Sequence, residues 1–479
     1  MSILDNIEPK NVLYWFEELS KIPRGSGNTK PPCDFCEAVA KKYNLEFVRD
    51  SANNCIIKKP ASKGYEDSAP VIIQGHLDMV CEKNEDCDID FENDAIRLKT
   101  DGEYIYADGT TLGGDDGIAV AMALAILTDE NAVHPPLEVV FTSDEEIGML
   151  GAEKLDCSGL KGRQLINIDS EEEGIFTVSC AGGNVSECVL PVEKESFDGE
   201  CYEITVGGLA GGHSGVEIDK GRHNANILLA RVLDAVSEVC EMRIVSVEGG
   251  LKDNAIPVLS KAVVSVASGN LEKTVSKCEN VFKNEAVKED SELYVKINST
   301  DNEVPFSKDS TEKIICMLMC LPNGIQEMST DIQGLVKTSL NIGILKSDSK
   351  CVTASYCVRS SMSSEKEALK RKLHLLMKSL GGSVKHTGDY PAWEYQRNSP
   401  LRDVMCKVFE EEYGHKPECV AIHAGLECGM FCGKIDGLEC VSVGPDIKDI
   451  HTPKERLDIK SVQRTWDFLL KVLAEMKKQ

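Results

Sequence analysis

The stretch that decides the fold is residues 110–128, TTLGGDDGIAVAMALAILT, in which a glycine-rich turn leads into a helix that is apolar nearly all round. A helix without a polar face is expected to be buried. Short apolar runs precede it at residues 54–58 (NCIIK) and 70–74 (PVIIQ) and follow it at 136–142 (PLEVVFT) and 165–168 (LINI). Strands that alternate with a buried helix at this spacing predict an α/β fold, with a mainly parallel sheet and helices on both faces.

A second pattern begins near residue 184, where longer alternating strands and amphipathic helices are grouped rather than interleaved. Examples are residues 201–206 and 261–266 for strands and 224–240 for a helix. Such grouping favours an α+β insert with an antiparallel sheet. Because the 479 residues also exceed the usual size of one hydrophobic core, we expect a second domain over residues 187–388.

The pattern of the first part returns near the end of the chain. A connection that contains Gly and Pro, residues 382–399, is followed by a helical stretch, a strand-like stretch and a closing helix at residues 401–413, 439–443 and 459–478. We therefore predict that the first domain is split into two parts, residues 1–186 and 389–479, by the inserted domain.

Composition limits the classes of partner. The 53 Lys and Arg against 79 Asp and Glu give a net charge of −26, which argues against broad binding to nucleic acid or to anionic membranes. The longest apolar run, residues 118–127, is about half of the ~20 residues that a membrane helix needs. The opening residues MSILDNIEPK lack the pattern of a secretory signal, and the 20 Cys lack the spacing of a disulfide framework. We therefore expect a cytoplasmic protein with reduced thiols and a small-molecule substrate.

The first candidate site residues follow the strand at residues 70–74. His76 and Asp78 are two residues apart, and in extended chain their side chains point to the same face. A carboxylate beside an imidazole is how a metal-binding histidine is held in one tautomer. Taken alone, a surface histidine beside an acid would explain the pair better.

Acidic residues follow the glycine-rich turn and the next strand. Asp115 and Asp116 stand between glycines that allow unusual backbone geometry, although acids at the start of a helix are commonly caps. The acidic run DEE, residues 144–146, follows the strand at 136–142. Because adjacent residues rarely point the same way, one of these acids can bind a metal while its neighbour acts on water.

Two more candidates complete the set. Asp169 directly follows the strand at residues 165–168, and His451 lies in a loop rich in Gly and Pro. Most of the set falls at the carboxyl ends of predicted parallel strands, where ligands collect in such sheets. Mixed imidazole and carboxylate ligation suits zinc, with cobalt or manganese as substitutes. Five ligands around a bridging carboxylate would support two ions about 3.5–4 Å apart, and a remaining Glu would deprotonate the water between them.

The chain as a whole resembles the aminoacyl-histidine dipeptidases, also called Xaa-His or β-alanyl-histidine dipeptidases. These belong to the clan of zinc exopeptidases that contains carboxypeptidase G and aminoacylase. The resemblance covers nearly the whole chain, in order, and it rests on nine runs: GHLDMV (75–80), GTTLGGDDGIA (109–119), DEEIGMLGA (144–152), INIDSEEEG (166–174), CAGG (180–183), GGHSG (211–215), DNAIP (253–257), HAGLECG (423–429) and DIHTP (449–453).

The resemblance implies a role for each residue of the set. Five residues would be ligands of two zinc ions per subunit: His76 and Asp169 of the first, Glu146 and His451 of the second, and Asp115 of both. Asp78 would orient His76, Glu145 would be the general base, and the peptide bond between Asp115 and Asp116 would be cis. Related dipeptidases often have TEE where this chain has DEE, a change that precedes the paired glutamates and leaves both roles intact.

The inserted domain would be the lid of the catalytic domain, and in this clan the lid also forms a homodimer. His213, in GGHSG, would polarise the scissile carbonyl, often from the partner subunit. Asn254 and Arg359 would receive the peptide and the C-terminal carboxylate of the substrate, a task that suits the bidentate geometry of arginine. His423 and Glu427, in HAGLECG, are further candidates for the substrate site.

The function implied is the metal-dependent hydrolysis of Xaa-His and related dipeptides, with carnosine among the candidates. Two alternatives remain open. An N-acyl amino-acid deacylase or a tripeptidase of the same clan would use identical metal chemistry, so only the substrate pocket distinguishes them. A non-catalytic binding protein on the same fold would lose ligands, whereas this chain has every ligand position and the base.

Overall fold

The computed structural model describes residues 3–477, and these form two compact units. The first unit contains the described residues up to 180, residues 395–421 and those from 426 onward; the second contains residues 181–394 and 422–425. The sequence pattern sets the boundaries at 186/187 and 388/389 instead, and it gives no sign of the short segment 422–425. Within the described residues, no helix has both the length and the apolar character needed to cross a bilayer.

The first unit is built on an eight-stranded sheet with the strand order β1-β2-β6-β3-β7-β21-β8-β20. Its strands are β1 (Glu46–Arg49), β2 (Cys55–Lys59), β3 (Val71–His76), β6 (Leu137–Thr142), β7 (Gln164–Asn167), β8 (Ile175–Cys180), β20 (Glu418–Ile422) and β21 (Glu439–Ser442). The central strands β6, β3, β7 and β21 are parallel, whereas β2 pairs with β6 in the antiparallel direction. The predicted α/β fold is confirmed, and its parallel strands form the middle of the sheet.

Seven helices of the first unit accompany this sheet among the described residues. They are α1 (Lys10–Leu19), α2 (Lys30–Lys42), α3 (Gly114–Thr128), α4 (Leu150–Lys154), α9 (Pro400–Tyr413), α10 (Glu427–Lys434) and α11 (Ile459–Glu475). Helix α3 packs against β3 on one side and is covered by α1 on the other. All of its residues from Gly117 to Leu127 are buried, as the apolar composition predicts.

The packing of α3 on β3 is close enough to require glycine at position 75. A Cβ added to Gly75 would lie 2.6 Å from the Cβ of Ala119 and 2.6 Å from Oδ2 of Asp116. We expect Gly75→Ala to lower the free energy of unfolding by about 1–3 kcal/mol, because the backbone of α3 or β3 must shift to accept the methyl group. Urea denaturation would measure this. The matched control is Gly159→Ala, where a Cβ meets nothing within 4 Å; equal stability of the two variants would contradict the expected clash.

A smaller sheet in the first unit carries the loop with His451. Its order is β22-β23-β5-β4, formed by β4 (Leu98–Thr100), β5 (Tyr104–Ala107), β22 (Ile447–Lys448) and β23 (Arg456–Asp458). Strands β22 and β23 form an antiparallel hairpin, with Ile447 opposite Leu457. The hairpin therefore sets the position of the connecting residues 449–455.

The second unit has a larger sheet with the order β15-β10-β14-β12-β17-β18-β9-β19, and β16 pairs with β17. Its strands are β9 (Gly182–Pro191), β10 (Glu200–Gly207), β12 (Glu241–Gly249), β14 (Ser260–Ser268), β15 (Tyr294–Ser299), β16 (Gly324–Met328), β17 (Val336–Ser347), β18 (Cys351–Ser360) and β19 (Ser383–Tyr390). All the pairs are antiparallel, as predicted for the insert. The prediction of a connection over residues 382–399 is wrong in part, because residues 383–390 form strand β19. This strand lies at the edge of the sheet and most of its residues are exposed, so no apolar face marks it in the sequence.

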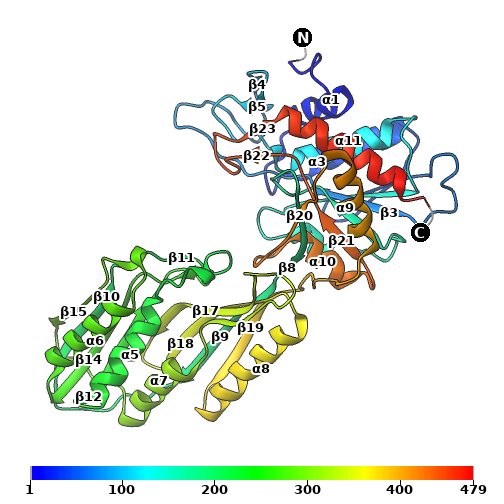
Figure 1. The fold of residues 1–479 in the computed structure, drawn as a ribbon. Helices are drawn as coiled ribbons and strands as arrows, with labels where there is room; N and C mark the ends of the chain where they lie inside the picture. Colours follow the sequence, from blue (N-terminus) through cyan, green and yellow to red (C-terminus); the bar gives the residue numbers. More distant parts are fainter. Residues whose placement is uncertain (1–2, 478–479) are drawn as a thin grey trace. The chain divides into compact units, whose positions relative to one another are not determined.

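Four helices share one hydrophobic core with this sheet: α5 (Ala225–Ser237), α6 (Leu271–Glu285), α7 (Lys308–Cys320) and α8 (Ser363–Ser379). Helix α5 contacts β10, β12 and β14, and α8 contacts β9, β18 and β19. The helices lie along the sheet in Figure 1. The second unit is therefore an α+β structure with its own core.

Candidate metal centre

The candidate ligands of the first unit meet at the carboxyl ends of its parallel strands. His76 is the last residue of β3, and it lies opposite Thr142 at the end of β6. Gln74 lies opposite Asn167, which is the last residue of β7. The loops that follow β6 and β7 carry the DEE run and Asp169 and therefore leave the sheet beside His76, as expected for ligands in an open α/β sheet.

The carboxylate of Asp115 lies between two histidines. Its Oδ1 is 3.0 Å from Nε2 of His76, and its Oδ2 is 3.1 Å from Nε2 of His451. The same nitrogen of His451 is 3.0 Å from Oε1 of Glu146. One carboxylate that offers each of its oxygens to a different imidazole has the arrangement expected of a ligand shared by two ions. The peptide bond from Asp115 to Asp116 is cis, as the family resemblance implies.

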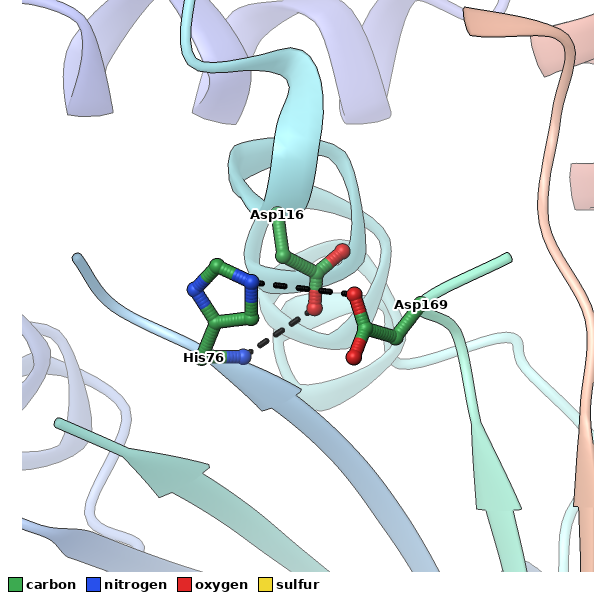
Figure 2. A group of neighbouring side chains, drawn as sticks. All are labelled: His76, Asp116 and Asp169. Carbon is green, nitrogen blue, oxygen red and sulfur yellow. Dashed lines mark hydrogen bonds and ion pairs between the residues drawn. The ribbon is translucent and has the colours of Figure 1, made fainter. Parts of the chain in front are cut away.

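Potential ligand atoms form three overlapping groups, each with its atoms within 4.8 Å of one another. One group is Asp115, Glu146 and His451; a second is His76, Glu145 and Glu146; a third is His76, Asp116 and Asp169. Figure 2 shows the third group, with Asp116 at the start of α3 and Asp169 after β7 both directed at His76. Nε2 of His76 is 3.6 Å from Oδ1 of Asp169. The structure thus brings together all five residues that the sequence proposes as ligands, and also Glu145.

Asp116 is a member of this cluster to which sequence reasoning gives no role beyond the cis bond. Its side chain is buried, and its Oδ2 accepts a hydrogen bond of 3.0 Å from the backbone N–H of His76. Burial raises the pKa of Asp116 well above its ordinary value. Its pairing with a backbone group of β3 could not be read from the sequence, because it depends on how closely α3 approaches β3.

Asp78 lies behind His76, on the side away from Asp115. Its Oδ1 is 3.5 Å from Nδ1 of His76, and its backbone oxygen is 3.2 Å from the same nitrogen. The carboxylate also accepts hydrogen bonds from the backbone N–H groups of Glu145 and Glu146, at 3.0 and 3.3 Å. A hydroxyl donor, Ser26, completes its contacts at 2.7 Å. Asp78 therefore fixes both the imidazole of His76 and the start of the loop after β6.

The loops around the cluster have backbone conformations that are uncommon outside glycine. Asp144 and His451 have φ of +52° and +58°. Asp144 is held by a hydrogen bond of 2.7 Å from the N–H of Gly27 to its Oδ1. In the hairpin loop, Oγ1 of Thr452 donates to the carbonyl of Asp449 at 2.7 Å. Left-handed residues that persist through such contacts are frequent at functional sites.

The electrostatics of the cluster fit bound cations. Burial, together with the charges of Glu427 and Glu146, raises the pKa of Glu145 to about 8. Burial and the charge of Asp116 raise the pKa of Asp169 well above its ordinary value. Hydrogen bonds to Asp115 and Glu146 raise the pKa of His451 to about 10. Several carboxylates buried close together cannot all be ionised at low cost. Divalent cations bound by these carboxylates and the two imidazoles would balance their negative charge.

Glu427 is a buried residue of the first unit that bonds to two of the strands carrying the cluster. At the start of α10, its Oε2 accepts hydrogen bonds of 2.6 Å from Gln74 and 2.6 Å from Thr142. Asn167 donates in turn to Gln74, at 2.6 Å. Because its carboxylate is 1% exposed and already bonded to β3 and β6, Glu427 supports the strands that carry the ligands in this structure.

Three of the substrate-site candidates lie close together in the second unit. His213 belongs to β11 (Gly212–His213), Arg359 to β18, and His423 to the segment 422–425. Burial and the positive charge of Arg359 lower the pKa of His213, and burial with the same charge lowers the pKa of His423 to about 3. Arg359 donates to the hydroxyl of Tyr390 at 2.9 Å, and its buried Nε has no hydrogen-bond partner within the described part of the chain.

The contacts of His213 define its tautomer. Its Nδ1 accepts hydrogen bonds from the N–H groups of Gly215 and Val216, at 3.3 and 3.2 Å. The proton of the neutral ring is therefore on Nε2, which is left as a donor. Asn254 precedes β13 (Ala255–Ile256), the partner of β11, and its carbonyl accepts from Ser214 at 2.9 Å while its side chain is exposed.

The sequence and the fold are both similar to those of known peptidases. The cytosol non-specific dipeptidase of Escherichia coli K12 is 37% identical over 482 residues, which cover 99% of each chain. The crystal structure of aminoacylhistidine dipeptidase from Vibrio alginolyticus is 34% identical, with a TM-score of 0.94 over 100% of this chain and 99% of that one. A tripeptidase from Staphylococcus aureus, 15% identical with a TM-score of 0.55, shares the fold.

The model of peptidase family M20/M25/M40 matches residues 72–475. This range includes every candidate ligand described above, the whole second unit and the part of the first unit from residue 72 to residue 475. The chain therefore belongs to peptidase family M20/M25/M40.

Proposed function

We propose that the protein is a metal-dependent dipeptidase that hydrolyses Xaa-His and related dipeptides, with carnosine among the candidate substrates. The observation that carries the proposal is the carboxylate of Asp115 between His76 and His451, each of which faces a further carboxylate. The full-length similarity to two dipeptidases supports the choice of substrate.

The metal would be zinc, two ions per subunit, with cobalt or manganese as substitutes, because the donors are imidazole nitrogens and carboxylate oxygens. His76 and Asp169 would hold one ion, Glu146 and His451 the other, and Asp115 both. Bound metal would supply a Lewis acid for the scissile carbonyl and make water acidic enough to deprotonate near neutral pH.

Glu145 would move the proton. It lies among the candidate ligands, and its backbone is held by Asp78. Its carboxylate takes a proton from the attacking water and returns it to the leaving amine, so that one water is consumed and two amino acids are released.

The second unit would supply the substrate contacts. The N–H at Nε2 of His213 would donate to the carbonyl that is being attacked, and Arg359 would bind the C-terminal carboxylate through its guanidinium. Asn254 and His423 would contact the rest of the dipeptide. The tautomer of His213 and the Nε of Arg359, which has no hydrogen-bond partner among residues 3–477, support these roles, since both leave a donor available.

A substrate panel tests the proposal against its alternatives. We expect the zinc-loaded protein to hydrolyse Gly-His, β-Ala-His and other dipeptides at least about tenfold faster, in kcat/KM, than tripeptides or N-acetyl amino acids, a difference of about 1.4 kcal/mol in transition-state binding. A preference for N-acetyl amino acids or for tripeptides would identify the deacylase or the tripeptidase instead. An inert, metal-free protein would identify a non-catalytic binding protein.

We also propose a cytoplasmic homodimer that uses the second unit as its lid and interface. The name of the E. coli relative supports the location. If His213 serves the site of its partner subunit, mixing the inactive variants Glu145→Gln and His213→Ala should restore activity, because some heterodimers then contain one complete site. Mixtures that stay inactive after subunit exchange would show that each chain builds its own site.

A further inference from the structure

A buried carboxylate outside the candidate ligand set holds the loop that carries Asp115. Glu455 is 2% exposed and lies four residues after His451, in the hairpin loop between β22 and β23. Its Oε2 accepts the N–H groups of Leu112 and Gly113, at 2.8 and 3.1 Å. Its Oε1 accepts those of Gly114 and Asp115, at 2.7 and 3.3 Å. Four successive backbone donors therefore converge on one side chain.

These contacts join two candidate ligands that are far apart in the sequence. Asp115 is at the end of the loop that Glu455 binds, and His451 is in the same short loop as Glu455. The N–H of Glu455 also donates to the carbonyl of Thr452, at 3.1 Å, which closes the turn that follows His451. Any movement of Glu455 would thus alter the distance between Asp115 and His451.

A buried arginine completes the arrangement from the other side of the loop. Arg24 is 3% exposed, and its Nη1 donates to the carbonyls of Leu77 and Asp78, at 3.0 and 2.9 Å. Its Nη2 donates to the carbonyl of Gly113. The side chains of Arg24 and Glu455 therefore connect the segment after His76, the Asp115 loop and the His451 loop without using a side-chain ligand atom.

We propose that Glu455 is a positioning residue that sets Asp115 and His451 at ligand distance before any metal binds, and so raises the affinity of the ion that these two residues share. This inference rests on the proposed metal-dependent function. Its physical reason is preorganisation: groups that support a ligand from behind typically contribute about 10- to 100-fold to metal affinity.

The substitution Glu455→Gln removes the charge and one acceptor oxygen of the side chain while keeping its size. The amide has the same shape, but it replaces one acceptor oxygen by an NH₂ group that would face two backbone N–H donors. Two donors of the Asp115 loop then lose their acceptor, and the loop must move. Glu455→Asp keeps both oxygens and the charge but shortens the side chain by one methylene group.

A matched control exists in the same unit. Glu138, on β6, is 4% exposed and likewise accepts backbone N–H groups, from Lys161 at 3.1 and 2.9 Å and from Gly162 at 2.8 Å. Neither of the residues whose N–H groups it accepts is a candidate ligand or lies in a loop that carries one. Glu138→Gln therefore reports what the loss of such a buried acceptor does to stability alone.

The experiment titrates each metal-free full-length protein with zinc against a chromophoric chelator. We expect Glu455→Gln to bind one of its two zinc equivalents about 10- to 100-fold more weakly than the wild type, Glu455→Asp to lie between them, and Glu138→Gln to match the wild type. Thermal melting of the metal-free proteins should show that both glutamine variants are folded, each with a lowered Tm.

Two results would overturn the inference. One is a zinc titration of Glu455→Gln that superimposes on those of Glu138→Gln and the wild type, which would make Glu455 merely structural. The other applies if Glu455→Gln does not fold: Glu455→Asp then decides, and wild-type zinc affinity in that variant refutes the positioning role. If the wild type itself binds no zinc, the proposed function fails first, so the two failures are distinguishable.

Discussion

Replacing Glu145 by glutamine is expected to lower kcat for dipeptide hydrolysis by about 10²- to 10⁴-fold, the usual contribution of a general acid–base group. The amide has nearly the same size but cannot take up a proton from water. The loop should keep its place, because the bond to Asp78 comes from the backbone N–H of Glu145 rather than from its side chain. Steady-state kinetics and metal analysis of the same sample would show lost turnover with retained metal.

The control for this prediction is Glu153→Gln, an exposed acid on α4 of the same unit. It should leave kcat unchanged, since surface substitutions rarely matter. Suppose instead that Glu145→Gln held its metal and kept more than about a tenth of the wild-type kcat. Such a loss is smaller than a general base contributes, so another group would have to move the proton.

The second large effect is expected for Asp115→Ala. Because the two oxygens of Asp115 face His76 and His451 separately, the substitution removes a donor from both halves of the cluster. We expect both zinc ions to bind more weakly. The loss of a residue that only orients a ligand typically lowers metal affinity by about 10- to 100-fold, and we expect a larger loss here at each site. Dipeptide hydrolysis should fall below detection at micromolar zinc.

Asp169→Ala is the matched comparison. Of the two histidines in the described cluster, Asp169 contacts only His76. The substitution should weaken one zinc equivalent and leave the other near its wild-type affinity. Competition titrations of both variants would measure this. If one of the two zinc-binding steps in Asp115→Ala kept its wild-type affinity, Asp115 would not be a shared ligand.

Much of this architecture could be predicted from the chain because its signals are local. The apolar run of α3 and the short strands β3, β6 and β7 have compositions that only a buried layer explains. The polar residues that follow these strands could be grouped because parallel strands bring their carboxyl ends to one edge. The edge strand β19 was not predictable in this way, since its residues face solvent.

The supporting residues could not be found from local patterns. Glu455 reads as one charge in the surface-like run KER, and Arg24 as a cation in a Gly- and Ser-containing loop. Their role depends on burial and on backbone groups from segments more than 50 residues away, which are carbonyl acceptors for Arg24 and N–H donors for Glu455. Asp116 is similar: its contact with the backbone of His76 follows from the close approach of α3 to β3 at Gly75.

The position of His423 and Glu427 shows the same limit. Both lie in the run HAGLECG, and the sequence offers them together as substrate contacts. In the fold they belong to different units: His423 is part of the second, where its Nε2 is 2.7 Å from Oγ of Ser339, and Glu427 is part of the first, where it accepts a hydrogen bond from Gln74 of β3. A change of unit within four residues leaves no trace in composition or periodicity.

The central claim is that two metal ions held by one cluster make this chain a dipeptidase. The most direct test follows the hydrolysis of Gly-His while the metal-free protein is titrated with zinc. The account predicts no hydrolysis without metal and a rate that rises until two equivalents per chain are bound, then stays level. Hydrolysis that is independent of zinc, or none at any ratio although the protein is folded, would contradict it.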